Sequence, residues 1–110
     1  MIYTAWTFKT ARLRVALELH DCDDLDLSWD DDGSVRDGLE RGVFIAFDAS
    51  VVVKLDGREV GRDWLGQCVY RSADDFRYGG GYFPDMVSEA VADARRNIAK
   101  LRDFPMRIAA

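Results

Sequence analysis

The chain's one histidine lies two positions from a cysteine, and these two residues are the best placed for nucleophilic chemistry. They are His20 and Cys22. A cysteine nucleophile needs a base within hydrogen-bond reach and a third group that orients the base. Residues i and i+2 of a strand share a face, so the spacing permits such a pair. The competing interpretation is a solvent-exposed histidine at a strand end beside a structural cysteine. We predict no catalytic residue.

Aspartates dominate the segment that follows, and carboxylates are ligands for Ca²⁺. Between residues 20 and 33 the chain has no basic residue and seven aspartates: Asp21, Asp23, Asp24, Asp26, Asp30, Asp31 and Asp32. An EF-hand loop needs a glycine at position six and an acid at position twelve. A loop starting at Asp24 has Trp29 and Val35 there, and a start at Asp30 fails in the same way. We therefore predict no metal and no cofactor, with an irregular, weak divalent-cation site as the alternative.

Two other kinds of active site do not fit the sequence. The triple glycine 79–81 is followed by neither a Lys-Ser/Thr pair nor a Gly-x-Gly-x-x-Gly pattern, so it is not a phosphate loop. Glycoside hydrolysis needs a cleft and one carboxyl group with a raised pKa, and a run of exposed aspartates offers neither. The sequence therefore predicts a protein that is not an enzyme.

The charge distribution indicates the chemical class of a partner. The net charge is −5, with 13 acidic against 7 basic residues in positions 1–60 and 7 against 8 in positions 61–110. A basic footprint for nucleic acid is absent, so we predict no direct binding of DNA or RNA. An acidic cluster attracts basic surfaces, which favours a basic protein partner.

The acidic segment is the main candidate contact surface. In an extended chain, carboxylates at i and i+2 lie about 6.6 Å apart, whereas DNA carries one charge per roughly 3.4 Å along each strand. The segment is therefore a sparse imitation of a nucleic-acid backbone, and a solvated loop that keeps the protein soluble is the other interpretation. The candidate partner-binding residues are Asp23, Asp24, Asp26, Trp29, Asp30, Asp31, Asp32, Asp37 and Glu40.

A second candidate interface is aromatic. Tyr78, Tyr82 and Phe83 flank the triple glycine, and aromatic residues are enriched at protein interfaces. The alternative is that Tyr82 and Phe83 pack beneath the last helix.

Periodicity predicts the elements that position these residues. Residues 5–19 alternate as a long strand whose parity changes at Thr10 and Ala11, which indicates a bulge or a tight turn; its second face, with Arg12, Arg14, Ala16 and Glu18, is expected to be solvated. Leu25, Leu27 and Trp29 are expected to anchor the acidic loop. A short helix follows from Ser34, predicted to be its N-cap in a capping box with Asp37, to about Arg41, with Gly42 at C′.

The second half of the chain contains a hairpin and a long helix. Residues 43–47 and 51–55 are rich in strand-forming types, and Asp56-Gly57 predicts a type I′ turn. The returning strand runs through Val60 to residues 68–70, and residues 72–76 form one helical turn. Residues 85–102 form an amphipathic helix with Val87, Val91, Ala94, Ile98 and Leu101 on one face.

We therefore predict a single α+β domain over residues 1–110, with an antiparallel sheet, a C-terminal amphipathic helix packed on it and one short helix, in the order β-α-β-β-β-α. No apolar run is long enough to span a membrane and no signal peptide is evident, so we expect a cytoplasmic protein. We expect a monomer or a weak homodimer.

Three segments carry a resemblance: Trp6 to Arg12, Asp23 to Gly33 and Tyr82 to Val87. They resemble stretches of small phage and mobile-element proteins, and the short acidic chain is similar in kind to anti-CRISPR proteins, which inhibit bacterial CRISPR effector complexes. Anti-CRISPR proteins share no common fold or catalytic residues, so no residue role is carried over. The resemblance implies a non-enzymatic inhibitor in the host cytoplasm, bound to a basic nucleic-acid-handling surface such as a DNA-binding subunit. The alternative is a phage accessory or assembly protein, or an antagonist of another host defence or transcription protein, that binds through the aromatic residues.

Overall fold

The computed structural model describes the backbone of residues 2–109 and the side chains of residues 2–102, and in this part of the chain an antiparallel sheet packs against a long helix. The predicted α+β class is confirmed, but the order of elements is β-β-α-β-β-α-α. The strands are β1 (Ile2–Lys9), β2 (Leu13–Asp21), β3 (Ile45–Leu55) and β4 (Arg58–Tyr70), and the helices are α1 (Ser34–Glu40), α2 (Ala73–Gly79) and α3 (Tyr82–Ala109). Consecutive strands pair, in the order β1-β2-β3-β4.

The predicted strand over residues 5–19 is two strands joined by a tight turn, one of the two explanations offered for its change of parity. The backbone N–H of Thr10 donates to the Leu13 carbonyl at 2.8 Å, and the Thr10 hydroxyl accepts from the Leu13 N–H at 3.1 Å. Across this hairpin Phe8 pairs with Val15 and Trp6 with Leu17. From Trp6 onward, even positions of β1 therefore share a face with odd positions of β2, and a register shift between Thr4 and Trp6 reverses this relation at the start of β1.

The Asp56-Gly57 hairpin is confirmed. Both residues have positive φ, 51° and 82°, as a type I′ turn requires. Residues 43–47 and 51–55, predicted as separate strands, belong mostly to the single strand β3. Strand β4 is also continuous, and a register shift opposite Asp48 absorbs its Gly66-Gln67 pair as a bulge.

The core lies between one face of the sheet and α3. Its fully buried members include Leu17, Val51 and Val53 from the sheet, and Ala90 from α3. Small residues on the helix allow close approach: a Cβ at Gly61 would lie 2.4 Å from the Ala90 carbonyl oxygen.

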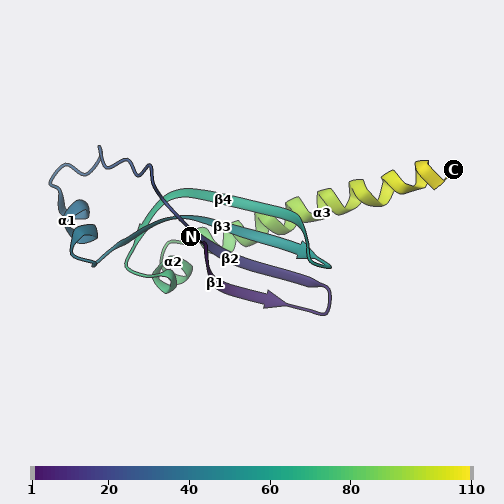
Figure 1. Ribbon diagram of the computed structural model, residues 1–110, viewed down its shortest axis with the longest axis horizontal. Helices are drawn as coiled ribbons and strands as arrows, with labels where there is room; N and C mark the ends of the chain where they lie inside the picture. Colours follow the sequence, from purple (N-terminus) through teal and green to yellow (C-terminus); the bar gives the residue numbers. More distant parts are fainter. Residues whose placement is uncertain (1, 110) are drawn as a thin grey trace.

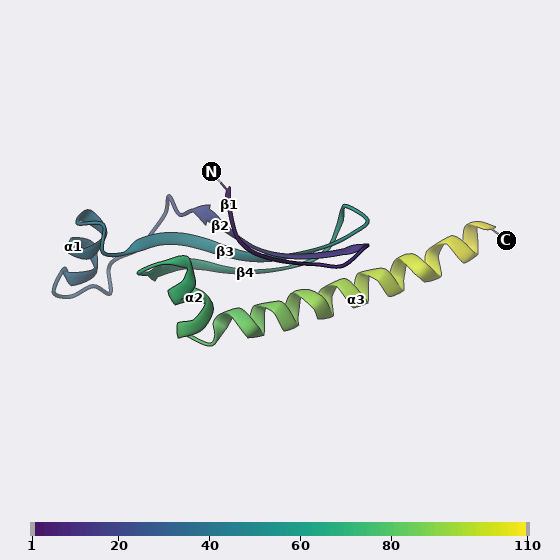
Figure 2. The same ribbon diagram turned by 90° about the horizontal axis from the view of Figure 1, so that it is seen from below.

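Helix α3 begins at Tyr82, three residues before the predicted start. Gly81 precedes it with φ 77°, and Pro84 falls in the first turn, where a missing N–H has no intrahelical partner to lose. Its buried positions are Met86, Ala90 and Ala94. Leu101 was predicted on the apolar face but is 60% exposed, because the helix continues past the end of the sheet (Figure 2).

Two views show an elongated molecule with different features at its two ends. The loop after β2 and helix α1 lie beyond one end of the sheet, and the C-terminal part of α3 extends from the other (Figure 1). The principal extents are 64 × 27 × 25 Å. Within the described residues, no helix has an apolar stretch that would cross a bilayer.

Candidate functional site

The loop after β2 and helix α1 form an acidic lobe, which we define as residues 22–41. Its eight carboxylates against two arginines give a formal charge of −6, more than the −5 of the whole chain. The lobe contains the predicted partner-binding residues, namely Asp23, Asp24, Asp26, Trp29, Asp30, Asp31, Asp32, Asp37 and Glu40. The structure therefore brings this predicted set together at one end of the molecule (Figure 1).

Three of the aspartates are hydrogen-bonded to backbone N–H groups of the lobe. Asp26 Oδ1 accepts from the Ser28 N–H at 2.9 Å, and Asp32 Oδ1 accepts from the Ser34 N–H at 3.0 Å. These bonds lower the pKa of the Asp26 and Asp32 carboxyls, so both stay ionised to a lower pH than a free aspartate does. Aspartate is favoured in such turns for this reason, and the lobe owes part of its order to its own charges.

Asp30 performs the capping that was predicted for Ser34. Its two carboxylate oxygens accept from the N–H groups of Val35 at 3.2 Å and Arg36 at 3.0 Å, two of the four donors that the helix leaves unpaired at its start. The N-cap residue is Gly33 in a left-handed conformation, without a side-chain cap. The predicted Ser34–Asp37 capping box is therefore wrong, because the turn brings the carboxylate of Asp30 to the helix start.

The C-terminal end of α1 agrees with the prediction. Gly42 has φ 76°, its N–H donates to the Leu39 carbonyl at 3.2 Å, and the Val43 N–H donates to the Gly38 carbonyl at 2.8 Å. This pair of bonds is a Schellman motif with glycine at C′. A Cβ at Gly38 would lie 2.3 Å from the Phe44 ring, so Phe44 packs directly on the helix backbone.

Gln67 attaches the lobe to the sheet. Its side-chain Oε1 accepts from the Asp26 N–H at 2.9 Å, and its own N–H donates to Asp48 Oδ1 at 2.8 Å. Gln67 lies in the β4 bulge with φ 55°, and this conformation turns it towards the lobe. Leu25 and Leu27 are half-buried, as expected of anchors, but Trp29 is 58% exposed. The carboxylates are thus held on an ordered support.

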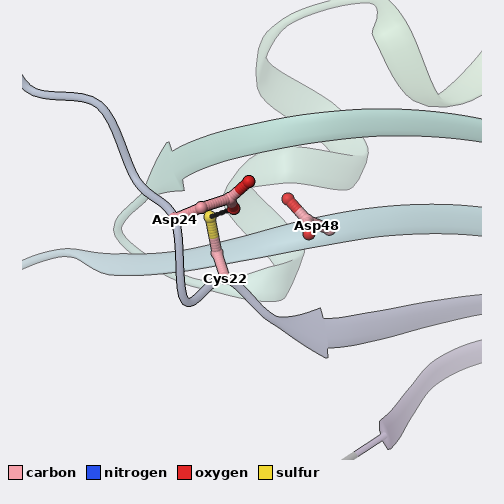
Figure 3. Close-up of side chains that lie close together, drawn as sticks. All are labelled: Cys22, Asp24 and Asp48. Atoms are coloured by element: carbon pink, nitrogen blue, oxygen red, sulfur yellow. Dashed lines mark hydrogen bonds between the residues drawn. The ribbon is translucent and has the colours of Figure 1, made fainter.

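Three possible metal ligands meet where the lobe leaves β2. The thiol of Cys22 and the carboxylates of Asp24 and Asp48 have donor atoms within 4.8 Å of one another (Figure 3). Thiolate and carboxylate are Zn²⁺ ligands, and a structural Zn²⁺ site takes four. Burial and the nearby Asp48 and Asp24 raise the pKa of Cys22, so the thiol keeps its proton at neutral pH and donates to Asp24 at 3.9 Å.

The open face of the sheet holds a polar cluster that the sequence analysis missed. Ser50 is fully buried, and its Oγ accepts from Arg62 Nη1 at 2.9 Å and lies 3.1 Å from His20 Nε2. Glu18 Oε1 lies 3.6 Å from the same histidine nitrogen and 3.8 Å from Arg62. This face was expected to be solvated, but the long side chain of Arg62 extends across it, and Ala16 beneath is completely buried.

The cluster contains a serine, a histidine and a carboxylate, but its geometry is not that of a hydrolytic triad. A triad needs the acid on one ring nitrogen and the serine on the other, whereas here Nε2 of His20 faces both Ser50 and Glu18. The fully buried Ser50 is also closed to substrate. Residues from three strands meet here, so only the strand register could have revealed the cluster, and no local sequence signal does.

The second candidate interface divides into exposed and packed residues. Tyr78 is 77% exposed and Tyr82 is 52% exposed. Phe83 instead packs edge-on against Trp6, with ring centroids 5.1 Å apart. The alternative prediction, packing beneath the helix, therefore describes Phe83 and not Tyr82.

Comparison with protein-family models, with curated proteins and with solved structures gave no match for this chain. Its own residues must therefore support any functional inference.

Proposed function

We propose that this protein is a non-enzymatic inhibitor whose acidic lobe binds a basic, nucleic-acid-handling surface of another protein. The observation that supports the proposal is the ordered lobe with a formal charge of −6 at one end of the molecule. A fixed cluster of one sign steers a partner of opposite charge and speeds association. The resemblance to anti-CRISPR proteins makes a bacterial CRISPR effector complex, in the host cytoplasm, the first partner to test.

The carboxylates are not equivalent in this role. Asp26, Asp30 and Asp32 hold the turns of the lobe. Asp31 and Glu40 are exposed, and their side chains make no hydrogen bond or ion pair within the described residues. Contact charges are therefore tested best at Asp31 and Glu40, where neutralisation leaves the fold intact.

The test is capture of purified CRISPR effector complexes on the immobilised protein, at low and high salt, with and without competing DNA. The proposal expects capture that weakens as salt rises, because exposed charges are screened beyond about 8 Å at physiological ionic strength. It also expects DNA and this protein to exclude each other. Capture that is insensitive to salt, or that leaves DNA binding unchanged, would contradict the proposal.

The exposed tyrosines support a second candidate function, a phage accessory or assembly protein, or an antagonist of another host defence or transcription protein. Tyr78 and Tyr82 lie on either side of the turn between α2 and α3, and tyrosines are frequent energetic anchors of interfaces. Under this alternative, alanine at both positions abolishes partner binding at every salt concentration. Under the first proposal, the same variant still captures the effector complex in a salt-sensitive manner.

A further inference from the structure

Strand β4 is an edge of the sheet, and among the described residues the hydrogen bonds from α3 reach only its first half. The Val60 carbonyl accepts from Asn97 Nδ2 at 2.8 Å, and the Arg62 N–H donates to Asp93 Oδ2 at 3.1 Å. Both partners belong to α3, so these backbone groups point away from β3. The backbone groups of successive residues alternate between facing β3 and facing outward along an antiparallel strand. The N–H and carbonyl groups of Trp64 therefore face outward too, and the register after the bulge places those of Val69 outward.

The second half of this edge lines a cavity. The cavity measures about 300 Å³, and its walls are the consecutive residues 65–70 of β4 together with Trp29 and Tyr82. Successive side chains of a strand point to opposite faces, so a hollow that touches all six residues extends along the edge itself. Trp29 comes from the acidic lobe and Tyr82 from the start of α3.

Carboxylates lie next to the same stretch of edge. The Asp48 carboxylate accepts from the Gln67 N–H at 2.8 Å, and an Asp24 carboxylate oxygen lies within 4.8 Å of one of Asp48. A Cβ at Gly66 would lie 3.6 Å from Asp48 Oδ1. The surroundings of the free edge are therefore negative, which favours lysine and arginine side chains on whatever occupies it.

We propose that the edge of β4 from Trp64 to Tyr70 binds an extended basic peptide, which adds a strand to the sheet between Trp29 and Tyr82. Added strands bind through main-chain hydrogen bonds and gain specificity from pockets for alternate side chains. This inference rests on the proposed function, since it names the part of the basic partner that the protein recognises. It also accounts for the exposure of Trp29, which forms one wall of the cavity and is not part of the hydrophobic core.

The test uses two peptide pools of equal charge. In the first, lysine alternates with Val, Ile, Tyr or Phe over eight residues, and in the second every backbone nitrogen of the same sequence is methylated, which removes the donors on both edges of the extended peptide. The proposal expects the first pool to shift the amide resonances of residues 64–70 and the Trp29 indole resonance. It expects the N-methyl pool to bind at least about tenfold more weakly, the effect of roughly one or two lost hydrogen bonds.

Three results would overturn the edge site. Equal binding of both pools would mean attraction by charge alone, and shifts confined to residues outside 64–70 would place the peptide elsewhere. No binding of the first pool would exclude the site, and if an effector complex were still captured in a salt-sensitive manner, the proposed function would stand without it. Trp29→Ala should weaken binding of the first pool, whereas Tyr3→Ala, a similarly exposed aromatic residue on β1 and outside the cavity lining, is the matched control.

Discussion

The packing of α3 on β4 makes a sharp prediction at Gly61. A Cβ built there would lie 2.4 Å from the Ala90 carbonyl oxygen, 2.6 Å from the Ala94 nitrogen and 2.8 Å from the Ala94 Cβ. Two of these are backbone atoms, so the contact is relieved only if the helix moves away from the sheet. Gly61→Ala should therefore destabilise the protein, although the same change at an unhindered site removes entropy from the unfolded chain and stabilises.

The size of the effect follows from that overlap. Overpacking a well-filled core by one methyl group costs about 1–3 kcal/mol. With an unfolding entropy of about 2.1 cal/mol/K per residue over 110 residues, Tm should fall by roughly 4–13 °C. Gly66→Ala is the matched control on the same strand, because the nearest atom to its Cβ lies 3.6 Å away. Its Tm should be unchanged or slightly raised.

The assay is thermal unfolding of both variants and the wild type by circular dichroism, with urea unfolding as a second measure. The wild-type m-value should be kept, which shows that the same surface is exposed on unfolding. If Gly61→Ala proved as stable as Gly66→Ala, the close approach of α3 to β4 would be refuted, and with it the arrangement that leaves only the second half of β4 as a free edge.

Three further predictions concern the lobe and the two cysteines. Asp30→Ala should cost about 0.5–2 kcal/mol in urea unfolding, as loss of a helix cap does, whereas Asp31→Ala should be neutral; equal effects would contradict the capping role. In thiol titration with a disulfide reagent at pH 8, both cysteines should react more slowly than a free thiol. Cys68 should be the slower of the two, because burial raises its pKa to about 11. If Cys22 reacted as fast as a free thiol, its thiol would not be held protonated. The pKa of Asp26 is lower in the folded than in the unfolded protein, so the stabilisation by its carboxylate is present above about pH 4 and is lost as pH falls through the folded pKa. The free energy of unfolding of Asp26→Asn should therefore fall less than that of the wild type between about pH 5 and about pH 3. An equal fall in both proteins would refute the assignment.

Features that depend on neighbouring residues could be predicted from the sequence. The Asp56-Gly57 turn needs two residues with positive φ, and few residue pairs adopt that conformation readily. Gly42 ends α1 for a similar reason, since a left-handed C′ position favours glycine. The long amphipathic helix was evident from its periodicity, although its first turn was missed because Pro84 was placed outside the helix.

Features that depend on long-range pairing could not be predicted in this way. Ser50 meets both His20 and Arg62 only because three strands take one particular register. The capping of α1 by Asp30 depends on the path of a turn and not on the spacing of a capping box. For the lobe, composition identified the candidate residues, but only the structure separates the carboxylates that hold the turns from Asp31 and Glu40, which do not.

The central claim is that the acidic lobe is the contact surface, and association kinetics with a captured CRISPR effector complex test it most directly. The variant Asp31→Asn/Glu40→Gln and the control Asp85→Asn/Glu89→Gln make the same change in formal charge, the first on the lobe and the second on α3. At about 50 mM salt, we predict that the lobe variant associates roughly threefold to tenfold more slowly than the wild type, since charge steering accounts for about 10- to 1,000-fold in association rate. The α3 variant should match the wild type. Equal association rates for the two variants would contradict the claim.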